Sequence, residues 1–514
     1  MNGEGEEIPA MNIHEGSAIE TMIIEYGTSW TRRLYQAVRV GREEWLQAIK
    51  TVKESCKKCR YLIGTQEVEQ DQAGVTRAIN AFVRDVVRYN NAVQEVIIHK
   101  DQSIHREICL YMFQSILIPF VTEYDLRPVY SDFVQELIFV SLPCVCIAIS
   151  RLFVPRKIND SNLELFASKI QVLTALETFH FEHGCTNLVT AKIALYCCRL
   201  KEVCLRFSKR VDDECVDDLL RLRALEILDI SGTSISDEGY SKLLSGLPRI
   251  QNIVWPGCMD SVLASVTLDK IHSLQRFSGE ISDPLLIANI CPNITHLTLS
   301  GVKCNLTPLK ELDKLVHLSL KNCNYRDVCL SELLEAIGRH LVTLELIGIS
   351  KINTTSLINN LPLLEKLKLS SSELLPLNQN TFNPAAPHFI NVKEIKLHSV
   401  MGNIKLNEVL TWYNDLHIFH AFSVDSIDDS LVHYLVRCGV LQNASMLIVD
   451  DCQRLSFEAI RCVIENCKCL TYLGNLGMLP SISKDEIGEL KLLAQEKRPS
   501  LEIRIVRDPE ISIF

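Results

Sequence analysis

One short pattern returns along about two thirds of this chain and constrains its fold more than any other feature. In each copy three apolar residues keep the spacing L-x-x-L-x-L, as at Leu315, Leu318 and Leu320. Other clear copies are Leu341/Leu344/Leu346, Leu364/Leu367/Leu369 and Val392/Ile395/Leu397. From Phe179 to Ile503 the mean period is about 25 residues, which is a period of stacked repeats. The pattern therefore predicts a solenoid.

The spacing also predicts what each repeat looks like. Alternate residues of a strand point to opposite faces, so the last two leucines of a copy share one apolar face. A single strand cannot bury that face, and neighbouring repeats must stack into one continuous core. A period of roughly 20–29 residues with this strand signature is typical of leucine-rich repeats. We expect an α/β fold, with a curved parallel sheet on the concave face and helices outside.

The rest of the repeat fits the same interpretation. After each strand a small polar residue or a thiol is placed to serve backbone amides in a turn. These turn positions are Ser208, Thr233, Cys258, Ser282, Cys323, Ser372 and Cys452. Amphipathic segments that follow predict outer helices. They are 237–248, 331–340, 428–438 and 456–467.

The run from Cys291 to Leu299, CPNITHLTL, resembles the helix end and strand of cysteine-containing leucine-rich repeats. That subclass is best known from F-box and elongin-binding adaptors of ubiquitin ligases. The resemblance implies that the chain recognises a protein substrate for such a ligase. It also implies that Skp1-like or elongin and cullin subunits connect the chain to the ligase. Fold-level resemblance alone does not fix function.

The amino-terminal third has a different periodicity. Residues 1–25 show none and are interpreted as a flexible tail. From Trp30 to Cys59 apolar residues form one helical stripe, and further helices are expected near 75–97, 104–118 and 129–140. We therefore predict a helical domain over 26–164, a possible docking region for an adaptor, and a solenoid with its cap over 165–514.

Composition limits the compartment and the class of partner. The net charge of −10 argues against general nucleic-acid binding. The 20 cysteines are scattered and the first residues do not resemble a secretory signal, so reduced thiols and a cytoplasmic or nuclear location are expected. The apolar stretch 137–149 is too short to span a membrane, which needs about 20 residues. A soluble protein that binds no membrane is expected.

Motifs for catalysis, metals and cofactors are missing from the sequence. It contains no glycine-rich phosphate loop, no GxSxG and no HExxH. Cys56 and Cys59 have the spacing of half a zinc site, but two thiols on the buried stripe of a helix explain them more simply. Cys452, Cys462 and Cys467 fall on repeat positions. We expect no enzyme activity, no metal and no cofactor.

Two segments compete as the docking box for an adaptor. Ser141-Leu142-Pro143-Cys144-Val145-Cys146 follows the start of an elongin-binding box, although Ser150 replaces its aliphatic residue. Cys109 and Leu110 belong to a second segment that lacks the leading Ser-Leu. The docking candidates are therefore Cys109, Leu110, Leu142 and Cys146. The alternative is that both segments are ordinary helix core.

The residues that flank the strand leucines point out of the stack and form the expected binding surface. The partner-binding candidates are His317, Ser319, Lys321, Glu345, Lys366, Lys368, Lys396, His398, His420 and Phe422. Their lysines predict a basic patch for an acidic or phosphorylated protein segment. The alternative is that these lysines only keep the sheet soluble and protect it from pairing. The nine basic residues between Arg32 and Arg60 are interpreted as a solvated helix face.

The sequence thus favours a noncatalytic protein-binding module that recognises substrates for a cullin-RING ubiquitin ligase. A scaffold or regulator that binds another protein with no ligase attached is the alternative. The identity of the partner and the oligomeric state are not encoded in any motif.

Overall fold

The computed structural model describes residues 18–64, 72–94, 101–116, 122–144, 148–375, 391–400, 410 and 415–504. The chain divides into two compact units, Met1–Ile250 and Gln251–Phe514. We call them unit 1 and unit 2. No helix in the described part of the chain is long and apolar enough to cross a membrane.

Unit 1 begins with four helices. They are α1 (Ala18–Val40), α2 (Arg42–Gly64), α3 (Gln72–Gln94) and α4 (Gln102–Ile116). The single predicted stripe from Trp30 to Cys59 is divided between α1 and α2, which pack on each other with Trp30 and Trp45 both 2% exposed. Gly41 separates the two helices. Cys56 and Cys59 are fully buried, as the simpler interpretation of their spacing requires.

The repeats of unit 1 follow these helices. Their strands pair in parallel and in chain order: β1 (Glu123–Asp125), β2 (Arg151–Phe153), β3 (Thr178–His180), β4 (Glu202–Cys204) and β5 (Ile227–Asp229). The connections contain α5 (Asp132–Ser141), η2 (Leu142–Cys144), α6 (Asp160–Lys169), η3 (Ile170–Val172), α7 (Asn187–Tyr196), η4 (Asp213–Cys215), α8 (Val216–Leu219) and α9 (Asp237–Gly246). The first strand lies before residue 165, where the sequence pattern places the start of the solenoid.

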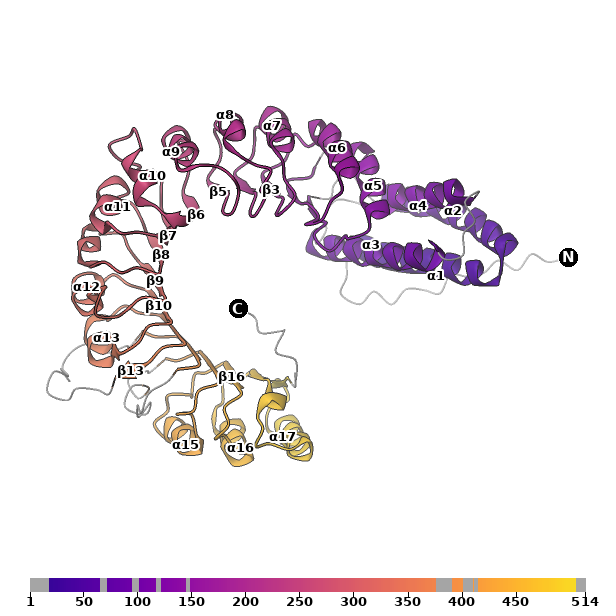
Figure 1. The fold of residues 1–514 in the computed structure, drawn as a ribbon. Helices are drawn as coiled ribbons and strands as arrows, with labels where there is room; N and C mark the ends of the chain where they lie inside the picture. Colours follow the sequence, from indigo (N-terminus) through magenta and orange to yellow (C-terminus); the bar gives the residue numbers. More distant parts are fainter. Residues whose placement is uncertain are drawn as a thin grey trace. The chain divides into compact units, whose positions relative to one another are not determined.

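Unit 2 is built from the longer repeats. Its main parallel sheet runs in order through β6 (Asn252–Cys258), β7 (Arg276–Glu280), β8 (His296–Ser300), β9 (His317–Lys321), β10 (Thr343–Ile347), β12 (Lys366–Ser370), β14 (Glu394–His398), β15 (Ile418–Phe422), β16 (Met446–Asp450), β17 (Tyr472–Gly474) and β18 (Glu502–Ile503). A second small sheet pairs β11 (Ile352–Asn353) with β13 (Leu374–Leu375). Within unit 2 the main strands line the inner side of the arc in Figure 1.

Helices form the outer layer of unit 2. They are α10 (Asp260–Ala264), α11 (Pro284–Ile290), η5 (Thr307–Glu311), α12 (Leu330–Ile337), α13 (Thr354–Asn360), α15 (Asp429–Arg437), α16 (Phe457–Asn466), η6 (Leu476–Met478) and α17 (Lys484–Lys497). The predicted outer segments are confirmed as α9, α12, α15 and α16. The expected α/β solenoid with helices before it is therefore the fold of this chain.

The repeat leucines form the core that the sequence predicts. On β9 both Leu318 and Leu320 are fully buried, and on β10 Leu344 and Leu346 are too. The register pairs Leu318 with Leu344 across the sheet, so the same position of successive repeats forms a continuous row. Burial of each leucine stabilises the stack by roughly 1.5–3 kcal/mol.

The turn after each strand links neighbouring repeats. The hydroxyl of Ser372 donates to the carbonyl of Leu346 and accepts from the amide of Ile349, at 3.2 Å each. Ser208 bridges its own pair of repeats in the same way. These hydroxyls satisfy backbone groups that the stack removes from water.

Thiols occupy the same turn position in other repeats. Cys323 is 4% exposed and Cys452 is fully buried, as predicted. The Cys323 thiol lies 3.2 Å from the carbonyl of Lys321. The prediction is wrong for Ser282, which is exposed, because its amide is bound by the Asp260 carboxylate at 2.8 Å instead. Thr233 is half-buried, and the side chain of Cys258 lies outside the described residues.

We predict that Cys323→Asp lowers the free energy of unfolding by about 3 kcal/mol or more, because it places an unpaired charge in a packed turn. Thermal and urea unfolding followed by circular dichroism measure the change. Cys323→Ser should be much milder, since serine already fills this position at Ser372. Cys469→Asp, at an exposed thiol, is the matched control. Equal stability of both aspartate variants would contradict the assigned register.

A buried histidine makes the helices of unit 1 sensitive to acid. His105 on α4 is 6% exposed, stacks on Phe133 at 5.2 Å and lies 3.1 Å from the Asn90 Oδ1 through its Nε2. Burial lowers its pKa to about 4. The native ring therefore stays neutral at a pH where the unfolded chain, with a histidine pKa of about 6.5, is already protonated.

Stability that depends on neutral His105 should be complete above about pH 6.5 and should fall between pH 6.5 and about 4. The loss is about 3 kcal/mol at most. Urea unfolding at pH 7 and pH 4.5 measures it. His105→Phe keeps an aromatic ring against Phe133 and should show a shallower dependence. Parallel pH profiles of the two proteins would show that His105 is not the titrating group.

Candidate functional site

The partner-binding candidates come together on the inner face of unit 2. We define this face as the residues of β7 to β17 whose side chains point away from the buried core. All ten lie on five adjacent strands, β9, β10, β12, β14 and β15. The register places Ser319, Glu345, Lys368, Lys396 and His420 in one row across the sheet. His398 and Phe422 are paired in the next row. Strand alternation alone predicts this grouping.

One residue of the row is not available to a partner. Ser319 is 1% exposed, and its hydroxyl donates to the Glu345 Oε2 at 3.0 Å. The bond fixes the Glu345 carboxylate next to its own strand. Ser319 thus positions a neighbour and offers no free hydroxyl at the surface.

Two of the four lysines share one carboxylate. Glu394 lies 3.2 Å from the Lys366 Nζ and 2.7 Å from the Lys396 Nζ. Burial raises the pKa of Glu394, but the bonds from Lys396 and Lys366 outweigh it and hold the pKa below its usual value. Glu394 is therefore ionised at neutral pH, and the three groups together carry one positive charge.

The other two lysines have no ion-pair partner among the described residues. Lys321 and Lys368 are half-buried. We call Lys321, Lys366, Lys368 and Lys396 the lysine patch. Its net charge depends on Lys321 and Lys368, a distinction that sequence alone cannot make because it depends on side-chain pairing.

Two histidines of this face, His317 and His398, add little charge at neutral pH. Burial lowers the pKa of His317, which stacks on His296 at 5.3 Å. Burial also lowers the pKa of His398, whose Nδ1 lies 3.2 Å from the Ser370 hydroxyl and whose ring meets Phe422 at 4.6 Å. Both rings are neutral near pH 7, and they pack against neighbouring aromatic rings on the sheet.

A buried acid beside His420 was not predicted. Asp450 is 4% exposed at the end of β16, and its Oδ2 accepts from Asn475 Nδ2 at 2.9 Å. His420 Nε2 lies 3.6 Å from the same oxygen, beyond hydrogen-bond distance. Neither His420 Nε2 nor Asp450 Oδ1 has a hydrogen-bond partner among the described residues.

An apolar patch adjoins the lysine patch and was also not predicted. It consists of Ile418, Met446, Ile448 and Tyr472, which are half-buried. Ile418, Met446 and Tyr472 are paired in one row across β15, β16 and β17. The sequence signal is the strand Met446–Asp450, where apolar residues fill outward as well as inward positions.

The docking candidates lie in unit 1, around α4 and α5. Cys109 is fully buried and Leu142 is 1% exposed, so both side chains belong to the core. Leu110 is half-buried and faces away from that core more than Cys109 does. Cys146 lies outside the described residues. In this conformation only Leu110, among the described candidates, offers surface to a partner.

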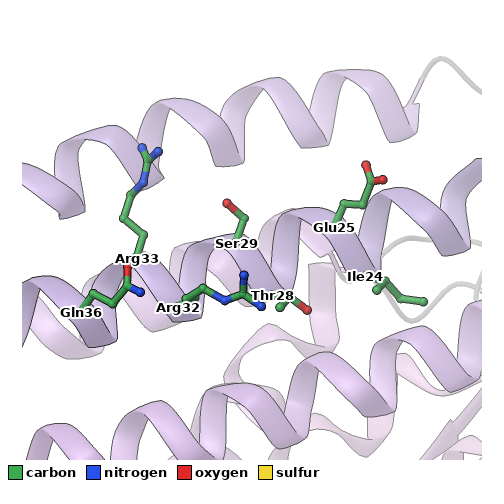
Figure 2. A pocket seen from close by; sticks show the side chains of 7 residues that line it. All are labelled: Ile24, Glu25, Thr28, Ser29, Arg32, Arg33 and Gln36. Atoms are coloured by element: carbon green, nitrogen blue, oxygen red, sulfur yellow. The ribbon is translucent and has the colours of Figure 1, made fainter. Parts of the chain in front are cut away.

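The basic helical segment borders two open hollows, and one of them, lined by Arg32, Asp85 and Arg88 among others, lies between α1 and α3. A surface hollow on α1 is lined by Ile24, Glu25, Thr28, Ser29, Arg32, Arg33 and Gln36 (Figure 2). All seven lining residues belong to one helix, so no second element closes over a ligand there. Within the described residues no group of three His, Cys, Asp or Glu side chains could hold a metal ion.

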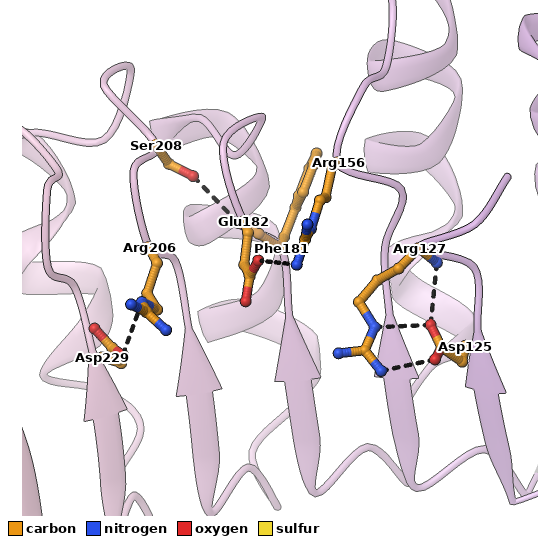
Figure 3. A network of polar contacts seen from close by, with 8 residues as sticks. All are labelled: Asp125, Arg127, Arg156, Phe181, Glu182, Arg206, Ser208 and Asp229. Atoms are coloured by element: carbon orange, nitrogen blue, oxygen red, sulfur yellow. Dashed lines mark hydrogen bonds and ion pairs between the residues drawn. The ribbon is translucent and has the colours of Figure 1, made fainter. Parts of the chain in front are cut away.

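Three arginines near the strand ends of unit 1 are paired, in contrast to Lys321 and Lys368 of the lysine patch. Arg127 binds Asp125 through two nitrogens at 2.9 and 2.7 Å, Arg156 meets Glu182, and Arg206 meets Asp229 (Figure 3). Surface pairs of this kind contribute little stability, about 0–1 kcal/mol. They also leave little net charge where the strands of unit 1 end.

Comparisons with known proteins give the context of the fold. No protein-family model matches the chain. The solved complex of Rad7 and Elc1 from yeast contains a chain that is 18% identical, with 86% of this chain and 94% of that chain covered at a TM-score of 0.40. An internalin of Listeria monocytogenes is 15% identical, with 66% and 89% covered and the same TM-score. A leucine-rich-repeat protein of Leptospira interrogans is 14% identical, with 77% and 91% covered and a TM-score of 0.32.

We predict that Glu394→Gln lowers the free energy of unfolding by about 1 kcal/mol. The lysines are 57% and 41% exposed, so water screens much of their attraction to the carboxylate. Urea unfolding at pH 7 measures the change. Glu365→Gln is the matched control, because its pair with Lys393 is more exposed and should contribute less. No difference between the two variants would show that Glu394 is as well solvated as Glu365.

Proposed function

We propose that this chain is a noncatalytic recognition protein that binds an acidic or phosphorylated protein segment on the inner face of unit 2. The observation that supports the proposal best is the pair Lys321 and Lys368. Both are held on rigid strands, and neither has an ion-pair partner among the described residues. An incoming carboxylate or phosphate would supply the missing counter-charge through charge-assisted hydrogen bonds.

The geometry suits recognition rather than catalysis. The candidate side chains project from a continuous sheet whose backbone is fixed by pairing on both sides, so little ordering is needed when a partner binds. The alternative role of such lysines is protection against edge pairing. Lys321 and Lys368 lie on interior strands of the sheet, where that protection is not needed.

The role that we propose for this binding is substrate recognition within a cullin-RING ubiquitin ligase. Its support is the resemblance of the cysteine-containing repeats to those of ligase adaptors. Leu110 on α4 is the described docking candidate with exposed surface. The second candidate function is a scaffold or regulator with no ligase attached, which the burial of Cys109 and Leu142 favours. Affinity capture followed by mass spectrometry distinguishes the two by the presence of cullin, Skp1-like or elongin subunits.

Charge reversal at the two unpaired lysines tests the binding surface. The double variant Lys321→Glu/Lys368→Glu should weaken binding of the captured partner at least tenfold, about 1.4 kcal/mol. Binding by the wild type should also weaken as salt rises. Lys491→Glu on α17, which is exposed, is the matched control. If the double variant binds as well as the control while both melt alike, the site lies elsewhere.

A substitution on α4 tests the ligase role separately. Leu110→Glu should abolish capture of elongin or Skp1-like subunits and leave binding of the substrate unchanged. Leu195→Glu on α7, 58% exposed in the wild type, is the control for an added charge. Loss of the folded state in the Leu110 variant would assign this residue to the core and remove the docking proposal.

A further inference from the structure

The inner face of unit 2 changes chemistry along the solenoid. Its lysine patch occupies β9, β12 and β14, and its apolar patch occupies β15, β16 and β17. No charged side chain divides the apolar patch, because Ile418, Met446 and Tyr472 are direct neighbours in one row. Ile448 lies in the same row as Lys368 and Lys396, so one line across the strands passes from charge to hydrocarbon.

The distance from the unpaired lysines, Lys368 on β12 and Lys321 on β9, to Ile448 on β16 and Tyr472 on β17 sets a length. Neighbouring strands lie about 4.8 Å apart, so three steps from β12 to β16 cover about 14 Å. Six steps from β9 to β17 cover about 29 Å. An extended peptide advances roughly 3.4 Å per residue. A segment that crosses the strands therefore reaches from one of these two lysines to Ile448 or Tyr472 in about four to eight residues.

Unsatisfied polar atoms border the apolar patch. Asp450 is more than nine-tenths buried, and its Oδ1 accepts no hydrogen bond from any described residue. A buried carboxylate oxygen without a donor is costly. It lies on the same side of β16 as Met446 and Ile448, next to Phe422 in the register. The oxygen is covered by the fold, so it is not an acceptor for a partner, and the apolar side chains carry the contact at this end.

From these observations we infer that the partner segment has two parts. An acidic or phosphorylated group binds the lysine patch, and an apolar side chain about four to eight residues away packs on the apolar patch. This inference rests on the proposed function and specifies the class of segment recognised. The acidic group pairs with the lysines at one end, and the apolar side chain leaves water at the other end. One segment can therefore bind both patches.

The experiment selects peptides from a random library of 16-residue peptides displayed on phage, with the full chain as bait. The enriched sequences are then synthesised, and their affinities are measured by fluorescence anisotropy. We expect a shared pattern of acidic residues and a large apolar residue separated by about four to eight positions. Replacement of either element in a synthetic peptide by alanine should weaken binding at least tenfold.

Variants of the protein assign the two parts. Ile418→Thr/Ile448→Thr keeps β-branched residues in the strands and removes apolar surface, whereas Lys321→Glu/Lys368→Glu removes the charge. Each double variant should weaken a two-part peptide at least tenfold. Leu492→Thr on α17, 66% exposed in the wild type, is the control for the apolar change. The single substitution Met446→Thr replaces the isoleucine double variant if that variant does not fold.

The outcomes separate the two proposals. Peptides that need only acidic residues and respond only to the lysine variant would overturn the two-part segment and leave the proposed function intact. Peptides that respond to neither variant, or a selection that enriches none, would overturn both. Retention of binding by Ile418→Thr/Ile448→Thr with an unchanged melting temperature counts against the apolar anchor.

Discussion

Burial of one apolar face per strand is the constraint on which the rest of the structure depends. Leu318 and Leu320 are shielded only because Leu344 and Leu346 lie beside them, and each later repeat repeats the arrangement. Turn groups such as Ser372 then satisfy the backbone where successive repeats meet. Because all inward positions serve the core, the outward positions of the same strands are free to vary, and we propose that they carry recognition.

Sequence predicts this framework well because the repeat spacing is dictated by geometry. A leucine at every second position fixes which face of a strand is buried, so the location of Lys368 or His398 follows without a structure. Prediction fails where a contact depends on two distant residues. The sharing of Glu394 by Lys366 and Lys396 and the burial of Asp450 beside His420 are of this kind. The pattern also misses β1 and β2, which lie before residue 165, although they are no shorter than β3, which it includes.

The inner face of unit 2 differs in kind from the strand ends of unit 1. In unit 1 Arg127, Arg156 and Arg206 each meet a carboxylate, so their charges are compensated within the fold. In unit 2 the excess lies on Lys321 and Lys368, while burial keeps His317 and His398 neutral. The contrast gives a physical reason to place an acidic partner on the second unit, and the adjacent apolar patch gives that partner a second point of contact.

Site-specific photo-crosslinking tests the central claim most directly. A photoreactive phenylalanine analogue replaces Thr343, which points outward between the strands of Lys321 and Lys368, or Leu492 on the outer helix α17. Both proteins are irradiated in cell extract, and the crosslinked species are identified by mass spectrometry. The account predicts a specific protein adduct from position 343, which added salt diminishes, and none of that protein from position 492. The same adduct from position 492 alone would place recognition on the outer helices and contradict the account.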